Sequence, residues 1–467
     1  MVIPKPKRKL SRIIYLLLIF FILSHCASVV TNTSRYKDIE SAIRSNQFSS
    51  AIQKLKKQKT EKEYTKKDRL LYYLDLGICY QYADDLKLSN QTLQKADNTI
   101  EELYTRSISK LAGSFLLNDN ILEYSGEDYE NIYINIFKCI NYIELKDFEG
   151  AFVEVRKFNE KIERMSLRYD NLITNLNKLK EVQKYDIHFK KGEIQFHNSA
   201  LAKYLSLLMY RSQGDYDDAK IDLKSIKNIW ITQPDIYNFG QPKALEKSMQ
   251  KTDLTRLNFL SFIGLGPVKK AKGFKISTYD NYITISGLDY EYYDRIPIKI
   301  EEGYYFKFSL PEIKSRKSRV NSVKIYIDGK FKGELETIEN FSKVAKATFQ
   351  VKKPIIYLKT IIRAIIKGLA AQNQKKKISN DTGGSLLGRL ANAAIDITVD
   401  ISENADLRNW RLMPAKCLIG EFEIEPGTHK IEVRYFDCNN QLIHKNIHSN
   451  YTVHKGKLNL INSNCFK

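Results

Sequence analysis

The sequence predicts an α+β fold, in which an N-terminal α-helical repeat domain is followed by a β-sandwich-like domain with a helical insertion. From Ser34 to about Lys251, apolar residues recur with the helical period of 3.6 and almost no proline interrupts them. Beyond Phe259 the pattern changes to the apolar–polar alternation of β-strands. The chain has 467 residues, more than one ordinary domain. We therefore expect residues 26–256 to form the helical domain and residues 257–467 to form the β-rich domain.

Residues 1–25 are predicted to be a secretory signal peptide. Five basic residues precede an unbroken apolar run from Ile13 to Leu23, which leads into Ser24-His25-Cys26. The run is shorter than the about 20 residues that a membrane-spanning helix needs. The Leu-x-x-Cys ending resembles the lipobox of bacterial lipoproteins, and this resemblance implies cleavage before Cys26 and attachment of lipid to it. An uncleaved anchor and plain secretion are the alternatives, because His25 replaces the small residue usual before the lipidated cysteine.

The composition is strongly basic, with a formal charge of +21. Such a charge is typical of chains that meet nucleic acid, anionic lipid or acidic polymers. The expected envelope location argues against nucleic acid, and the lysines do not form an RNA-binding motif with aromatic residues. Part of the charge reflects a composition rich in Lys, Ile, Asn and Tyr, and the remainder favours phospholipid headgroups or acidic wall polymers.

Four stretches of the N-terminal half share a pattern that predicts helical hairpins. A small or polar turn, such as Lys146-Asp147 or Gly214-Asp215, is followed by a large apolar residue and then by an alanine three positions later. We expect Asp147 and Asp215 to cap the second helices, the large residues to fill the space between hairpins, and the alanines to let helices approach. The pairs are Phe48 with Ala51, Leu93 with Ala96, Phe148 with Ala151, and Tyr216 with Ala219.

This pattern resembles tetratricopeptide (TPR) repeats, with copies roughly 45 to 70 residues apart instead of that family's shorter period. Stacked hairpins form a curved slab whose concave face binds an extended peptide or a partner helix. Tyrosines at helical spacing are the candidate partner-binding residues of that face, although packing between helices is the commoner role of such a stripe. They are Tyr72, Tyr80, Tyr133, Tyr142, Tyr204 and Tyr210.

The C-terminal half contains short alternating segments that predict strands, with Asp328-Gly329 as a hairpin turn. Residues 323–333 and 422–433 resemble the two halves of a PEGA-type β-sandwich module. Residues 354–397 between them are predicted to be a helical insertion that either covers the sheet or lies in a membrane interface. The predicted strands are Lys275 to Thr278, Tyr282 to Ser286, Ile296 to Ile300, Tyr305 to Leu310, Ser322 to Ile327, Gly333 to Glu336, Cys417 to Glu425 and His429 to Phe436.

Several short stretches, above all Ala405-Asp406-Leu407-Arg408-Asn409-Trp410, are similar to an uncharacterised family of bacterial envelope lipoproteins. The resemblance spans nearly the whole mature chain and implies a TPR-like half joined to a β-rich half, without an established activity. Within it, Asp406, Arg408 and Trp410 are candidates for contact with a partner. Alternatively, Arg408 and Trp410 fasten the helical insertion to the sheet.

The sequence gives no sign of catalysis, of a cofactor or of a metal site. It contains neither Gly-x-Ser-x-Gly nor a Walker loop. His444 and His448 are four residues apart, a spacing that forms a metal pair on a helix, but this segment is predicted to be strand and loop. Cys438 and Cys465 are the one pair of cysteines for which a disulfide is considered.

These observations predict an envelope lipoprotein that is not an enzyme. Lipidated Cys26 would tether it to a membrane, with the outer membrane facing the periplasm favoured. The helical repeat domain would bind an envelope protein partner, in a role near envelope or cell-wall assembly. A wall-active hydrolase with an unrecognised site and a surface antigen or adhesin are the alternatives. A deep cleft with convergent acids and a histidine would favour the hydrolase.

Overall fold

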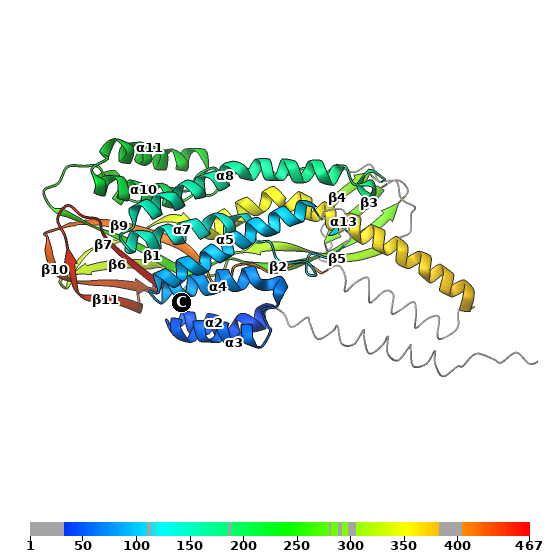
Figure 1. Cartoon of the computed structure of the whole chain (residues 1–467), viewed down its shortest axis with the longest axis horizontal. Helices are drawn as coiled ribbons and strands as arrows, with labels where there is room; N and C mark the ends of the chain where they lie inside the picture. Colours follow the sequence, from blue (N-terminus) through cyan, green and yellow to red (C-terminus); the bar gives the residue numbers. More distant parts are fainter. Residues whose placement is uncertain are drawn as a thin grey trace, which may run out of the picture.

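The computed structural model describes residues 32–109, 114–115, 117–184, 188–279, 282–287, 292–297, 305–382 and 404–467. The predicted signal peptide, Cys26 and the end of the predicted insertion, residues 383–397, lie outside these ranges. The fold is mixed α/β, with helices that precede several sheets. In Figure 1 the helices lie along the long axis of an elongated molecule, on one side of the strands.

In the described part of the chain, eight long helices form four successive hairpins, and each long helix contacts the next one in the series. Three short helical segments lie in the connections: η2 (Lys66–Asp68), α9 (Lys180–Gln183) and α12 (Ala244–Lys247). The hairpins are α2 (Asn32–Arg44) with α3 (Phe48–Thr60), α4 (Arg69–Tyr82) with α5 (Leu86–Ser109), α7 (Asp128–Glu144) with α8 (Phe148–Asn177), and α10 (Ala200–Gln213) with α11 (Tyr216–Thr232).

All four hairpins turn in the same way. A residue with positive φ lies one or two positions after the end of the first helix. The backbone N–H of the residue that follows it donates to a carbonyl in the last turn of that helix. This hydrogen bond satisfies a carbonyl that the helix end would otherwise leave without a partner. The left-handed residues are Asn46 (φ 57°), Asp84 (63°), Lys146 (63°) and Gly214 (90°), and the accepting carbonyls belong to Ala42, Tyr80, Tyr142 and Tyr210 at 2.8, 2.9, 2.9 and 2.9 Å.

The hairpin predictions are confirmed in part. The Asp147 carboxylate accepts the backbone N–H of Gly150 at 2.9 Å and so caps α8. Asp215 makes no such bond, so the capping role predicted for it is wrong. Tyr216 is 56% exposed and does not fill the space between hairpins.

In the second hairpin, the residue that follows the turn is Leu86, and Ser89 stands where the other three hairpins have Ala51, Ala151 and Ala219. The assignment of this role to Leu93 is therefore wrong. Leu93 instead lies against Gly77 of α4, where a Cβ would come within 2.7 Å of the leucine side chain. The lack of a side chain at Gly77 thus allows α4 and α5 to approach closely.

Within the described ranges, twelve strands form three four-stranded sheets, in the orders β12-β1-β9-β8, β11-β10-β6-β7 and β4-β3-β2-β5. The strands are β1 (Thr255–Leu265), β2 (Val268–Tyr279), β3 (Tyr282–Gly287), β4 (Tyr292–Pro297), β5 (Tyr305–Lys314), β6 (Ser322–Ile327), β7 (Lys330–Glu334), β8 (Glu336–Asn340), β9 (Pro414–Ile424), β10 (Gly427–Phe436), β11 (Leu442–Val453) and β12 (Asn459–Cys465).

Strand β1 lies at the centre of the fold and is buried on both faces. It runs parallel to β12 and antiparallel to β9. Leu260 and Phe262 point into the core that is shared with the helices, whereas Leu257 and Phe259 point into the core shared with the second sheet. Because successive side chains of a strand point to opposite faces, one strand serves both cores. The sheet of β1 therefore lies between the helices and the sheet of β10.

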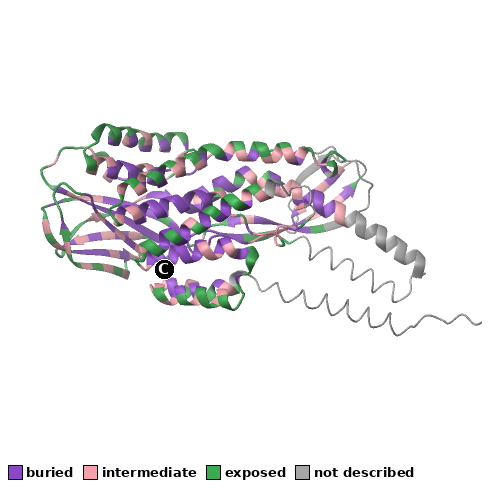
Figure 2. Cartoon of the chain, in the orientation of Figure 1, coloured by how far each residue is buried: buried purple, intermediate pink, exposed green. Residues whose placement is uncertain are grey.

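The predicted boundary at residues 256 and 257 falls inside β1. A single hydrophobic core includes residues from the helical half and from the β-rich half. The aromatic ring of Phe137 on α7 lies 5.9 Å from Phe262 of β1, 6.0 Å from Phe341 and 5.5 Å from Trp410. Figure 2 shows buried residues concentrated where the central helices meet the strands.

The predicted insertion begins earlier than expected. Helix α13 runs from Phe341 to Thr382 and contains Pro354 in its interior, so the predicted start at Pro354 is wrong. A proline in a helix removes a hydrogen-bond donor and bends the helix away from its own carbonyls. Here the backbone N–H of Gly192 donates to the carbonyl of Val351 at 2.7 Å. Apolar side chains of α13 from Val351 to Ile366, together with the C-terminal part of α8, cover the sheet β4-β3-β2-β5. This is the alternative in which the predicted insertion covers a sheet.

The strand predictions that fall on described residues are largely confirmed in place. Residues 298–300 of the strand predicted from Ile296 to Ile300 lie outside the described residues, and β4 runs from Tyr292 to Pro297. The Asp328-Gly329 hairpin is present, with φ of 50° and 77°, and β6 pairs with β10 although about a hundred residues separate them. The predicted strand from Gly333 to Glu336 is wrong, because β7 ends at Glu334 and β8 begins at Glu336. Cys438 and Cys465 are free thiols, the first exposed and the second buried, so the considered disulfide is absent.

Candidate functional site

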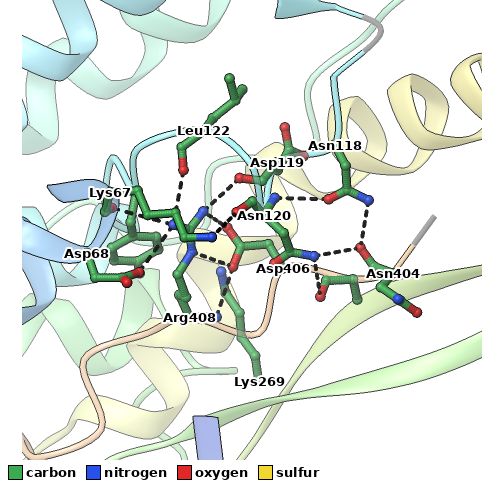
Figure 3. A network of polar contacts seen from close by, with 12 residues as sticks. Lys67, Asp68, Asn118, Asp119, Asn120, Leu122, Lys269, Asn404, Asp406 and Arg408 are labelled. Atoms are coloured by element: carbon green, nitrogen blue, oxygen red, sulfur yellow. Dashed lines mark hydrogen bonds and ion pairs between the residues drawn. The ribbon is translucent and has the colours of Figure 1, made fainter. Parts of the chain in front are cut away.

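The segment with the most specific motif, residues 404–410, joins the β-rich half to the helices. In Figure 3 the guanidinium of Arg408 lies among three parts of the chain: its neighbour Asp406, the Lys67–Asp68 region and the loop between α5 and α7. Arg408 Nε and Nη2 donate to the two carboxylate oxygens of Asp406 at 2.9 and 2.8 Å. Nη2 also donates to the carbonyl of Asp119 (2.7 Å), and Nη1 donates to the carbonyl of Leu122 (3.1 Å) and lies 3.5 Å from both the Lys67 carbonyl and the Asp68 carboxylate.

Arg408 is buried and Asp406 is largely enclosed, with its side chain 15% exposed. Burial opposes ionisation of Asp406, but Arg408 overcomes this effect and holds the pKa of Asp406 below its usual value. Burial likewise opposes the charge of Arg408, and Asp406 raises the pKa of the guanidinium. The side chains of Asn118 and Asn120 donate to the carbonyl of Asn404 at 3.1 and 3.0 Å. The segment is thus held by hydrogen bonds to the helical half on both sides of Asp406.

Asn409 and Trp410 continue the same attachment. The Asn409 side chain donates to the carbonyl of Pro267 at 2.8 Å. The backbone N–H of Trp410 donates to Glu130 Oε1 of α7 at 2.6 Å, and the indole is fully buried. Asp406, Arg408 and Trp410 therefore connect the helical hairpins with the strands. Trp410 is buried and therefore cannot belong to a binding surface. Arg408 and Trp410 do have the fastening role of the alternative prediction, but they attach their segment to the α4–α7 region and not the helical insertion to the sheet.

Two neighbouring glutamates beneath this segment have opposite pKa shifts. Burial and the adjacent Glu127 raise the pKa of Glu130 to about 7. Burial acts on Glu127 in the same direction, but ion pairs with Lys269 and Lys352 hold its pKa below the usual value. Carboxylates whose environments separate their pKa values are typical of acid–base sites.

These glutamates are enclosed by their own partners. Glu130 accepts hydrogen bonds from the Tyr124 hydroxyl (2.7 Å) and from two backbone N–H groups, and it is completely buried. Neither glutamate lines the hollow along α2 or the hollow between β5 and α13. The raised pKa of Glu130 means that this buried carboxyl can hold and release a proton as pH changes.

The structure divides the six candidate tyrosines into two groups. Tyr133 and Tyr204 are fully buried and Tyr80 is 8% exposed, so these three cannot line an open binding face. Tyr133 donates its hydroxyl to Glu339 of β8 at 2.9 Å. The helical array covers a sheet, which explains why tyrosines at these positions are enclosed. The half-buried tyrosines, which reach the surface, are Tyr72, Tyr142 and Tyr210.

Two buried carboxylates that sequence analysis missed join separate elements through tyrosines. Glu339 accepts the hydroxyls of Tyr133 and Tyr237, the hydroxyl of Ser199 and the backbone N–H of Leu201, all within 3.0 Å. Asp75 accepts the hydroxyls of Tyr36 and Tyr64 at 2.6 and 2.8 Å. An acidic residue amid apolar neighbours, as in Leu74-Asp75-Leu76, is the sequence signal that could have identified Asp75.

The hollows along α2 and between β5 and α13 are both lined by more cations than carboxylates. The hollow along α2, which sequence analysis did not anticipate, has a volume of about 570 Å³, and Arg411 from the segment after Trp410 faces Lys37, Glu40 and Arg44 there. Its other residues lie close together in the sequence, but the placement of Arg411 beside them depends on the fold.

Searches of the described residues for metal and membrane features gave no candidates. No group of three or more His, Cys, Asp or Glu side chains is placed to hold a metal ion there. In the same residues, no helix combines the length and the apolar character needed to cross a bilayer. Comparison of the sequence with protein-family models, with curated proteins and with solved structures gave no significant match.

Proposed function

We propose that the protein is a non-catalytic binding scaffold of the bacterial cell envelope, held at a membrane by lipid on Cys26. The basic, apolar and cysteine-terminated start of the chain supports secretion and lipid attachment. The outer membrane, with the folded part in the periplasm, is the proposed location.

The observation that carries the scaffold proposal is the recurrence of one turn in four consecutive hairpins. Each turn has a residue in the left-handed backbone conformation at the same position and the same backbone hydrogen bond, and successive helices contact one another. We interpret the hairpins as a TPR-like array of irregular period, an architecture that presents extended surfaces to protein partners. We likewise interpret the two sheets that share a core as a β-sandwich of PEGA type, because residues 323–333 and 422–433 lie on neighbouring strands.

The surface proposed for the partner lies on the later hairpins. Tyr142 and Tyr210 occupy equivalent positions, since each provides the carbonyl that accepts the hydrogen bond of the turn. Both are half-buried, and the Tyr210 ring packs against Phe152 of the adjacent helix in a tilted arrangement with ring centroids 4.7 Å apart. Helices α8 and α11 add apolar side chains that face solvent: Val153, Leu167, Ile221 and Ile231. Scattered apolar residues are usual on protein surfaces, so the tyrosines define the test.

Two measurements test the proposal. Mass spectrometry of the protein purified from its native envelope is expected to show cleavage before Cys26 and a mass increase from acyl chains, and Cys26→Ala is expected to lack both. A photo-crosslinking residue is then placed at Tyr142 or at Tyr210 in intact cells. We expect the same partner to be captured at both positions in wild type and its loss when Cys26→Ala is combined with them.

The matched control carries the crosslinking residue at Lys95, which is exposed on α5 away from the proposed surface. Capture of the same species at Lys95 would indicate random collisions and would contradict a specific surface. An unmodified Cys26 in mature protein would contradict the lipid tether. Hydrolysis of cell-wall material by the purified protein would contradict the non-catalytic role.

A further inference from the structure

The basic hollow along α2 is built by residues from both halves of the chain. Lys37, Ser41, Arg44 and Ser45 follow one another at helical spacing and so lie on one face of α2. Arg411 faces them from the segment that follows Trp410. We name this hollow, which Ser34 and Glu40 complete, the α2 basin.

The α2 basin carries more positive charge than its own residues neutralise. Glu40 is the one carboxylate of its lining, and it already accepts Arg411 Nε at 3.0 Å and Arg316 Nη1 at 2.8 Å. Arg44 donates to the carbonyl of Phe466 at 3.0 Å, a neutral partner. Lys37 is exposed and makes no hydrogen bond or ion pair within the described part of the chain. The lining thus has three cations and a single carboxylate, which Arg316 also contacts.

Arg316, which contacts Glu40 from beside the basin, experiences the charges of Arg411 and Arg44. Burial lowers the pKa of this guanidinium to about 10, and repulsion from Arg411 and Arg44 contributes in the same direction against the attraction of Glu40. Three guanidiniums therefore act on one another at close range. An anion from outside the chain would relieve this repulsion, because a negative charge near several cations lowers their mutual electrostatic energy.

The types of donor indicate which anion fits. Guanidinium groups present pairs of N–H donors that match the oxygens of phosphate and carboxylate, and hydroxyl groups donate to the same oxygens. Exposed Ser41 and Ser45 line the basin beside Arg44. A volume of about 570 Å³ accommodates more than an isolated ion. The basin is therefore suited to a phosphate group that carries an organic substituent.

The position of α2 indicates the source of that group. Five residues, 27–31, separate Cys26 from Asn32, where α2 begins. The six residue steps from Cys26 to Asn32 span at most about 20 Å when fully extended. If lipid on Cys26 lies in a membrane, the first turn of α2, next to Lys37, is held near the headgroups. We propose that the α2 basin binds the phosphate of an anionic phospholipid headgroup and so supplies a second membrane contact. This inference rests on the proposed lipid tether.

The test measures binding without relying on the tether. The full chain, purified in a neutral detergent, is titrated calorimetrically with dihexanoyl phosphatidylglycerol below its micelle concentration, at low and constant ionic strength. Dihexanoyl phosphatidylcholine and inorganic phosphate are titrated in parallel. We expect phosphatidylglycerol to bind at least about tenfold more tightly than either, because the choline cation meets the arginines and the inorganic ion lacks contacts of the glycerol. Equal or tighter binding of inorganic phosphate, or no binding of any ligand, overturns the proposal.

Two variants place a negative charge in the basin without removing a structural contact. Lys37→Glu and Ser41→Asp change exposed side chains, so both are expected to keep the melting temperature of wild type. Each is expected to weaken binding of phosphatidylglycerol by about tenfold or more. Lys95→Glu makes the same charge change on α5 and is expected to bind within about twofold of wild type. Wild-type binding by Lys37→Glu would overturn the proposal.

The outcome also separates this inference from the proposed function. An unlipidated protein that binds phosphatidylglycerol through the basin would contradict the tether alone. A lipidated protein that binds none of the three ligands would contradict the basin alone.

Discussion

Arg408 is the single side chain on which the junction between helices and strands most depends. It is 6% exposed and donates to a carboxylate and to two backbone carbonyls. We expect Arg408→Ala to lower the free energy of unfolding by about 3–5 kcal/mol, because it leaves the Asp406 charge buried and unpaired. Urea denaturation followed by circular dichroism measures this change.

The control for Arg408 is Arg106→Ala, which removes an arginine that is 42% exposed and should cost about 1 kcal/mol or less. The double variant of Asp406→Ala and Arg408→Ala should lose less than the sum of the two single variants, since neither charge is then stranded. Full additivity would indicate that the two side chains act independently and would contradict the pairing.

Asp75 makes stability depend on pH in a direction opposite to that of a paired carboxylate. Burial raises its pKa to about 7, although two tyrosine hydroxyls oppose this effect. Between pH 4 and 7 the folded state then binds more protons than the unfolded state, so the free energy of unfolding falls as pH rises. The fall is on the order of a few kcal/mol. Asp75→Asn removes the titrating group and should flatten the slope.

The measurement for Asp75 is urea unfolding at pH 4.5, 6 and 7.5 for wild type and Asp75→Asn. Buried Glu130 and Glu144 also have pKa values raised to about 7, so the variant should keep part of the slope. An identical slope in both proteins would show that Asp75 titrates normally in the folded state.

At the scale of elements, the repeated turn offers a direct test of backbone strain. Lys146 adopts a φ of 63°, where a side chain other than glycine is disfavoured by about 1 kcal/mol. We expect Lys146→Gly to raise the free energy of unfolding by about 0.5–1 kcal/mol, and Gly214→Ala to lower it by a similar amount. Lys95→Gly, inside α5, should instead destabilise by about 1 kcal/mol. Destabilisation by Lys146→Gly would show that the lysine side chain contributes more to stability than relief of the backbone strain at this φ.

Just before Pro354, helix α13 lies close against the segment that contains Gly192. A Cβ at Gly192 would overlap the carbonyl of Gln350, which is backbone and cannot move aside, and the Gly192 N–H donates to Val351. We expect Gly192→Ala to lower the free energy of unfolding by about 3 kcal/mol or more. Gly240→Ala is the matched control, because nothing lies within 4 Å of a Cβ there. Equal midpoints of urea unfolding for the two variants would contradict this contact.

The elements that sequence analysis predicted well are those with a local signal. Turn residues such as Lys146-Asp147 and Asp328-Gly329 fix the backbone by themselves, so both turns were predicted. Strand β1 was missed because it is buried on both faces and therefore lacks alternation. Pro354 was taken for a helix start, because a proline in the interior of a helix is disfavoured, yet α13 continues through it.

At the scale of the whole molecule, sequence analysis could not predict which surfaces meet. Tyr133 and Tyr204 have the spacing of a binding face, yet they are buried because the helices cover the sheet of β1. The partners of Arg408 lie nearly three hundred residues away, and Arg411 meets Glu40 across a still longer separation. Contacts of this kind depend on how the two halves are placed, and the pattern within either half carries no information about that placement.

The shared core implies that the helical and β-rich halves unfold together. Trp410 lies at their junction, with its ring 5.5 Å from Phe137, whereas Trp230 lies at the far end of the helical array. The variant Trp230→Phe leaves Trp410 as the single tryptophan of the chain, and its fluorescence then reports the junction. We expect its midpoint in urea to coincide with that of far-ultraviolet circular dichroism, which reports mainly the helices, as for a two-state transition. A junction that opens at a lower urea concentration than the helices would show two independent folding units. It would also show that the Arg408 network and the aromatic contacts around Trp410 are too weak to couple them.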